Sequence, residues 1–207
     1  MFHNSNESII DTISVELMET GFDPESHDAR AWLIHRAKEL HAIPTRSNSR
    51  LLKDPDRVIH DINRILPGRM YMFLYAAKTQ KTLPYWDRLP LVIPVERYRD
   101  GFLGMNFHYL QPQLRFTLID GLNRYRNNDK YNETTRLRLS YRLVSMFSRH
   151  RLVAPTLKRY LFPQIHSHVL WIQPTDWDVT LSLPCESFVK QPKHSVWKDT
   201  TSKIHGK

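Results

Sequence analysis

The chain has 207 residues, of which 41% are hydrophobic and 11% aromatic, with one cysteine and a formal net charge of +9. This length fits one domain, or one domain with an appended arm. No apolar run approaches the roughly 20 residues that span a bilayer. The N-terminus lacks the basic start and apolar segment of a signal peptide. The single Cys185 excludes an internal disulfide and indicates a reducing place of synthesis.

The charge is unevenly distributed along the chain. Residues 1–43 carry three basic and eight acidic side chains, a balance of −5, whereas residues 44–207 carry 27 basic and 13 acidic, a balance of +14. A body this basic suits an acidic partner: nucleic acid, an acidic protein surface or its own acidic arm. A basic surface that is merely solvated fits the same numbers, because charge alone sets no specificity.

The N-terminal part is predicted to be helical. Residues 7–20 and 28–42 each place apolar side chains on one helical face, and the "GFDPES" between them is a turn. We expect these helices to form an acidic arm, residues 1–43, that packs on the body or on another subunit. Residues 44–67 are predicted to be a linker with a short helix at 55–65. The α+β body then covers 68–190, and 191–207 form a basic tail.

From Gly68 the pattern changes to strands. The segments "RMYMFLYA", "LPLVIPVERY" and "FLGMNFHYL" are rich in aromatic and β-branched residues, and turn sequences separate them. Pro90 and Pro94 confine the second strand to an edge or a bend. Gly104 in the third indicates a bulge or a close backbone approach. Together they predict a small antiparallel meander, of the size seen in SH3-like barrels.

Helices are predicted to return after the meander, at 113–126 and 133–150. A further helix is expected to begin in "PTLKRYLF", where Pro155 suits a first turn. The alternating apolar residues of "WDVTLSLP" predict a half-buried strand. The basic C-terminal segment is predicted to be extended, with "SVW" as an added strand. The expected fold class is therefore α+β: a small antiparallel meander packed with several helices and preceded by a helical N-terminal arm.

The sequence offers little catalytic or metal-binding chemistry. His166 and His168 are a close pair without an acidic neighbour, and nothing near Cys185 activates it. No glycine-rich phosphate-binding motif occurs. Asp87 is expected to bond backbone in the turn around "YWDR". We therefore predict no enzyme, no catalytic residue, no metal and no cofactor.

Basic side chains mixed with aromatics are the stronger signal. They are typical of nucleic-acid surfaces, although arginine suits protein interfaces equally, and all of them could simply stay solvated. The predicted contact residues for a partner or nucleic acid are Arg115, Arg124, Arg126, Arg136, Arg138, Arg142, Arg149, Arg151, Lys158 and Arg159.

Distinctive stretches between roughly Gly68 and Asp199 resemble a protein family of phages. "TLPYWDRLPLV" and "DGFLGMNFHYL" are similar to the "TLPYYDRFPLV" and "DGFLGLNLHYL" of small virion-associated structural proteins of T4-like contractile-tailed bacteriophages. The later "NNDKYNETTRLRLSYRLV" and "LKRYLFPQIHSHV" also look like blocks of that family. The N-terminal arm is outside the resemblance.

The resemblance implies a structural assembly protein of a phage virion, made in the host cytoplasm and placed in the tail baseplate. Its partners would be other phage structural proteins in a symmetric, multi-copy assembly, with no membrane. The alternative, which the arginine-rich region 115–159 motivates, is a nucleic-acid-binding protein at the head–tail connector or the genome end.

Overall fold

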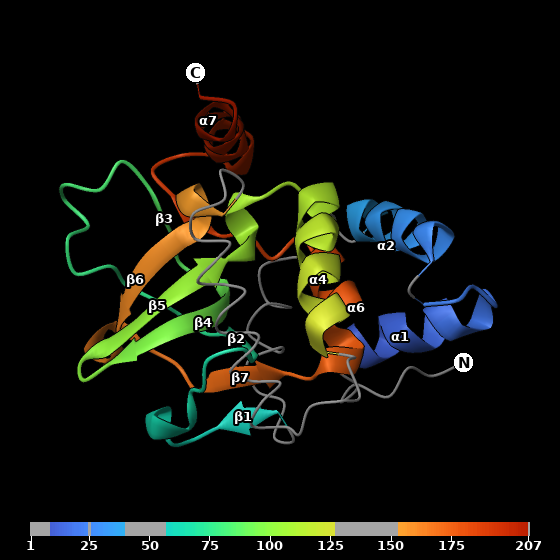
Figure 1. The fold of residues 1–207 in the computed structure, drawn as a ribbon, viewed down its shortest axis with the longest axis horizontal. Helices are drawn as coiled ribbons and strands as arrows, with labels where there is room; N and C mark the ends of the chain where they lie inside the picture. The colour runs from blue at the N-terminus through green and yellow to red at the C-terminus, as the bar shows by residue number, and fades with distance from the viewer. Residues whose placement is uncertain (1–8, 25, 40–56, 127–152, 207) are drawn as a thin grey trace.

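Six strands form one antiparallel sheet, in the order β1-β7-β2-β4-β5-β6, and a separate two-stranded sheet pairs β3 with β8 (Figure 1). The structure is a computed structural model that describes residues 9–24, 26–39, 57–126 and 153–206. The strands are β1 (Val58–Ile59), β2 (Met70–Met72), β3 (Trp86–Asp87), β4 (Leu91–Tyr98), β5 (Gly101–Asn106), β6 (Leu157–Leu161), β7 (Val169–Ile172) and β8 (Phe188–Val189).

Five α-helices accompany these strands in the described part of the chain. They are α1 (Ile9–Glu19), α2 (His27–Glu39), α4 (Pro112–Arg126), α6 (Trp177–Ser182) and α7 (Lys193–Ile204). Short 3₁₀ turns are η2 (Ile62–Arg64), η3 (Phe107–Tyr109), η4 (Ala154–Thr156), η5 (Phe162–Gln164) and η6 (Pro174–Asp176). The α+β fold class and the N-terminal helices are confirmed, and the sheet is larger than the predicted meander. None of the helices in the described ranges is long and apolar enough to cross a membrane.

The sheet buries side chains on both faces. Along β2, Met70 and Met72 join the core formed with α1, α2, α4 and α6, whereas Tyr71 and the following Phe73 enter a second cluster on the other face. The second cluster is rich in aromatic rings: Tyr160 lies 5.6 Å from Phe73 between ring centroids and 5.2 Å from Phe102. Alternation along the strands therefore supplies two cores.

The meander β2–β4–β5 forms as predicted, and its prolines and glycines have identifiable roles. The register of the β4–β5 pair shifts between Pro94 and Glu96. The irregularity in the strand pairing therefore lies in β4 and not at Gly104. A Cβ on Gly104 would lie 2.5 Å from Val92 Cγ2, and one on Gly101 would lie 1.9 Å from the carbonyl oxygen of Tyr160. The close approach of the Tyr160 backbone therefore requires a glycine at 101, whereas the packing of the Val92 and Phe102 side chains requires one at 104.

The two arm helices pack on the body through ion pairs. Arg30 of α2 bonds Asp120 of α4 at 2.6 Å and Asp178 of α6 at 3.1 Å. Arg57 joins Asp11 of α1 at 2.7 Å to Asp176 at 3.0 Å. The arm therefore shares a core and charged contacts with the body. In the predicted linker, the described residues form β1 and η2 and not a helix at 55–65.

Three predicted elements are wrong in type. "PTLKRYLF" forms η4 and strand β6 instead of a helix, because β5 offers an edge to which β6 bonds. "WDVTLSLP" forms helix α6 instead of a strand. The C-terminal segment forms helix α7, which buries Val196 and Thr200, instead of an extended tail. The predicted helix at 133–150 lies outside the described residues.

Candidate nucleic-acid interface

A cavity of about 410 Å³ lies where the segment that leads from β2 into β3 meets β6 and the C-terminal part of α7. Figure 1 shows the long loop before β3 beside β6, with α7 above them. This size is within the range of sites for small molecules, roughly 300–1,000 Å³. The lining residues are Tyr75, Ala77, Lys78, Thr79, Leu83, Pro84, Tyr85, Trp86, Asp87, Tyr109, Lys158, Arg159, Tyr160, Leu161 and Lys203.

Aromatic rings make up much of the wall. Tyr75 and Tyr160 are buried and meet edge to face at 4.9 Å, so they belong to the cluster beneath the cavity. Tyr85 and Trp86 are only half-buried. The indole N–H of Trp86 is buried and meets no acceptor among the residues that the structure describes. A buried donor without an acceptor is costly.

Positive charge lines the same cavity, with Lys158 at its centre. The Lys158 Nζ lies 4.4 Å from the ring centroid of Tyr109 and donates to the carbonyl oxygen of Pro155 at 2.8 Å. Burial, and then the nearby charge of Lys203, lower the pKa of Lys158 to about 8, with Asp199 opposing them. An anion in the cavity would relieve this unfavourable charge burial.

Acidic groups hold three of the other lining side chains. The hydroxyl of Tyr85 donates to Asp199, which also bonds Lys203 at 2.7 Å. Arg159 bonds Asp100, and its guanidinium lies 4.2 Å from the ring centroid of Tyr98. These contacts fix the rim of the cavity, and they leave Lys158 as its most buried positive group.

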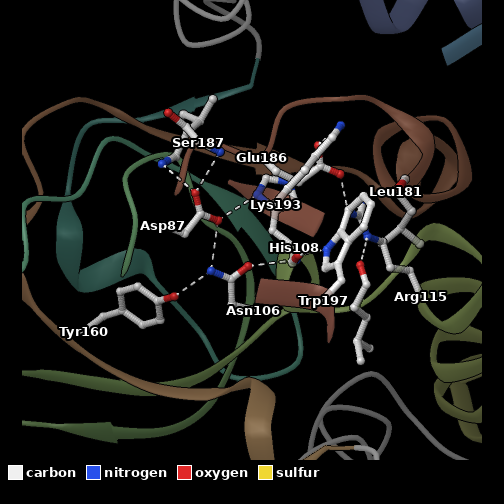
Figure 2. Close-up of polar contacts among 12 residues, drawn as sticks. Asp87, Asn106, His108, Arg115, Tyr160, Leu181, Glu186, Ser187, Lys193 and Trp197 are labelled. Atoms are coloured by element: carbon white, nitrogen blue, oxygen red, sulfur yellow. Dashed lines mark hydrogen bonds and ion pairs between the residues drawn. The ribbon is translucent and has the colours of Figure 1, made fainter. Parts of the chain in front are cut away.

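A buried polar network supports the floor of the cavity (Figure 2). The carboxyl of Asp87 accepts from the backbone N–H of Leu89 at 3.1 Å and of Ser187 at 3.2 Å, which confirms the predicted backbone-bonding role. Its other oxygen accepts from the Asn106 amide at 3.1 Å and lies 2.8 Å from Nδ1 of His108.

The Asn106 amide ties this network to the cavity wall. It donates to the hydroxyl of Tyr160 at 3.1 Å, and its oxygen accepts from the backbone N–H of His108 at 2.9 Å. Among the described residues, Nε2 of His108 has no partner, although the side chain is fully buried. Bonds that connect β3, β5 and β6 in this way hold the aromatic wall in one geometry.

The structure places Arg115 inside the protein. This position does not agree with the predicted role of Arg115 as a contact residue for a partner. Arg115 is fully buried and donates to the carbonyl oxygens of Leu110 at 2.9 Å and Leu181 at 2.8 Å, and to Glu186. Burial alone would raise the pKa of Glu186, but Arg115, followed by His108 and Lys193, lowers it to about 2. Figure 2 shows this cluster with Trp197, so Arg115 connects α4 to α7.

Among the predicted contact residues whose side chains the structure describes, Lys158 and Arg159 line the cavity. Arg124 and Arg126 lie in α4, but their side chains are outside the described part of the structure. The remaining five also lie outside it: Arg136, Arg138, Arg142, Arg149 and Arg151.

Sequence reasoning missed the aromatic lining, namely Tyr85, Trp86 and Tyr109. The aromatic residues were visible in "LPYWDRLP" and "FHYL", which the sequence predicts as a turn and the end of a strand. The clustering of aromatics with lysines from other segments appears only after folding.

The remaining candidate groups do not form a reactive centre in the described ranges. Burial, together with Glu186, raises the pKa of the Cys185 thiol to about 12, so it is protonated at neutral pH. The ring of His168 meets His60 edge to face at 5.1 Å. Within residues 9–24, 26–39, 57–126 and 153–206, no three His, Cys, Asp or Glu side chains are grouped to hold a metal.

Comparison with known proteins gives one family. Residues 35–203, about four fifths of the chain, match the family model described as Phage T4 terminal DNA protecting protein. No curated protein and no solved structure matches the chain. The expected origin in a T4-like bacteriophage is confirmed, whereas the description names DNA and says nothing of a baseplate. The chain belongs to the family of the phage T4 terminal DNA protecting protein.

Proposed function

We propose that this protein binds the ends of a phage genome and protects them. The observation that carries the proposal is the family match over residues 35–203, whose description names terminal DNA. The charge of +14 on residues 44–207 supports it, because a basic body attracts phosphates. Ends are the places where exonucleases enter linear DNA, so occupying them is sufficient for protection.

The proposal is binding without turnover: the basic body attracts the duplex, and the cavity is the place where we expect a terminal nucleotide to be held. Aromatic faces and lysines are the groups that hold bases and phosphates. The family description favours the genome end over the tail baseplate. We further propose that the protein travels in the virion with other phage structural proteins. Mass spectrometry of purified heads and tails tests that placement, and absence from both would refute it.

Protection of linear DNA tests the main proposal. End-labelled linear DNA is incubated with the protein and then with an exonuclease, while closed circular DNA serves as competitor. We expect protection that the circular competitor does not remove, and an affinity that falls steeply as salt rises, since phosphate contacts release counterions. Equal binding of linear and circular DNA, or digestion at the unprotected rate, would refute end binding.

A further inference from the structure

The cavity has room for one nucleotide. Its volume is about 410 Å³, and it is enclosed by three separate parts of the chain, namely the 75–87 segment, β6 and α7. Exposed lining residues such as Lys78, Thr79 and Lys203 show that it opens to solvent. A nucleotide that enters it from a duplex must leave the base stack.

The aromatic part of the lining suits a base. Tyr85 is held by its bond to Asp199 and by ring contacts with Tyr109 at 5.9 Å and Phe188 at 6.3 Å. A ring fixed in this way stacks with little loss of side-chain entropy. Beside it, the half-buried Trp86 adds a second aromatic side chain to the lining.

The cationic part suits a phosphate. Lys158 is largely removed from water, and its neighbour Lys203 has the same sign. A phosphate between them would add to the negative charge of Asp199, which bonds Lys203. The cavity thus places stacking faces and paired lysines within the span of a single nucleotide.

We propose that this cavity captures one unpaired nucleotide at a DNA end, with its base against Tyr85 and Trp86 and its phosphate between Lys158 and Lys203. The inference rests on the proposed end-binding function and deepens it. Inside a duplex, a base must be unstacked and unpaired before it can enter such a pocket, and this costs free energy. A terminal overhang avoids that cost, so the cavity itself distinguishes ends from continuous duplex.

Binding to duplexes that differ only at one end tests the proposal. In every duplex one end is closed by a hairpin. The other end is, in four separate duplexes, a second hairpin, a blunt end, a single-nucleotide 3′ overhang or a single-nucleotide 5′ overhang. We expect the wild-type protein to bind one of the overhangs about tenfold more tightly than the doubly closed duplex, as one stacked base predicts. Tyr85→Ala and Lys158→Met should remove this preference and retain the salt-dependent affinity for duplex.

Matched variants keep the test specific to the cavity. Tyr85→Phe keeps the ring and should keep the preference. Phe22→Ala and Lys198→Met remove an exposed aromatic and an exposed lysine outside the cavity lining and should behave as wild type. Urea titration confirms that each variant is folded. Overhang preference that survives in folded Tyr85→Ala and Lys158→Met would overturn the inference while end binding stands.

A second measurement does not depend on end binding. A deoxynucleoside monophosphate is titrated into protein with ¹⁵N-labelled tryptophan, and Trp86→Phe identifies the Trp86 indole signal. We expect that signal to shift with the nucleotide and to stay unchanged with inorganic phosphate alone. No shift at millimolar nucleotide would overturn the inference. A shift in a protein that fails to protect DNA ends would instead overturn the proposed function alone.

Discussion

Replacing Lys158 with methionine should stabilise the fold while weakening DNA binding. Lys158 lies in the cavity wall with its Nζ bonded to the Pro155 carbonyl and beside the Tyr109 ring. Burial and Lys203 lower the pKa of Lys158 from 10.5 to about 8. The folded state therefore holds the charged lysine less favourably than the unfolded chain does, and a neutral side chain of similar length removes that disadvantage.

The size of the effect follows from the two pKa values. The difference between 10.5 and about 8 corresponds to about 3 kcal/mol at neutral pH, at about 1.4 kcal/mol for each pH unit. Methionine loses the hydrogen bond to Pro155, which is worth about 1 kcal/mol. Solvent also screens the partly exposed lysine. We therefore expect Lys158→Met to raise the free energy of unfolding by about 1–2 kcal/mol at pH 7.5.

The sign of the pH dependence separates this cause from ordinary repacking. Between pH 8 and 10.5 the unfolded chain binds more protons at this lysine than the folded protein does, so wild-type stability rises with pH there. The advantage of Lys158→Met should shrink by about 1 kcal/mol between pH 7.5 and 9.5.

Urea unfolding at both pH values measures this change, with Lys198→Met as the exposed control. A variant less stable than wild type at pH 7.5, or an advantage independent of pH, would refute the reasoning.

Three further predictions address the buried contacts and the ligand. Arg115→Met should lower the free energy of unfolding by about 3–5 kcal/mol in urea titrations, because Glu186 is left buried without its partner, and adding Glu186→Gln should recover part of the loss. Gly101→Ala should cost about 3 kcal/mol or more in thermal unfolding, and more than Gly104→Ala, because its Cβ meets a backbone oxygen and not a side chain. DNA-end affinity of the wild type should fall between pH 7.5 and 9, as Lys158 loses its proton, and that fall should be absent in Lys158→Met. An affinity with the same pH profile in both proteins would contradict the last prediction.

Local sequence patterns were sufficient to predict an element where one of its faces is buried and the other is exposed to solvent. Helix α1 buries Ile10, Ile13 and Leu17 at helical spacing, and the sequence predicts it within two residues at its N-terminal end and one at its C-terminal end. The strands of the meander were recognised because turn residues separate them. In such segments the periodicity of the apolar residues directly reports the buried face.

Local sequence patterns predicted the wrong type of element where an element is buried on more than one side. In α6 the alternating apolar residues resemble a strand, but the intervening Thr180 and Ser182 are buried too. Their hydroxyls bond the carbonyl oxygens of Asp176 and Val179, so a helix accommodates them without unsatisfied groups. For β6 the deciding factor was the edge of β5, which is distant in the sequence.

The candidate site was the least predictable feature. Lys158 and Arg159 were identified by charge, but Arg115 has the same charge and lies inside the protein. Arg115 differs from these two residues because it pairs with Glu186, which lies 71 residues further along the chain. The cavity is an outcome of long-range packing, and single-residue properties do not reveal it.

The position of β6 at the edge of the described sheet has a consequence for self-association. An edge strand presents unpaired backbone groups that can recruit a strand from another copy, and short length with charged side chains discourages this. β6 has five residues and carries Lys158 and Arg159. Removing these charges would therefore favour aggregation through sheet extension, even where it strengthens the isolated fold. Of these two residues, Lys158 would then serve both solubility and the proposed ligand.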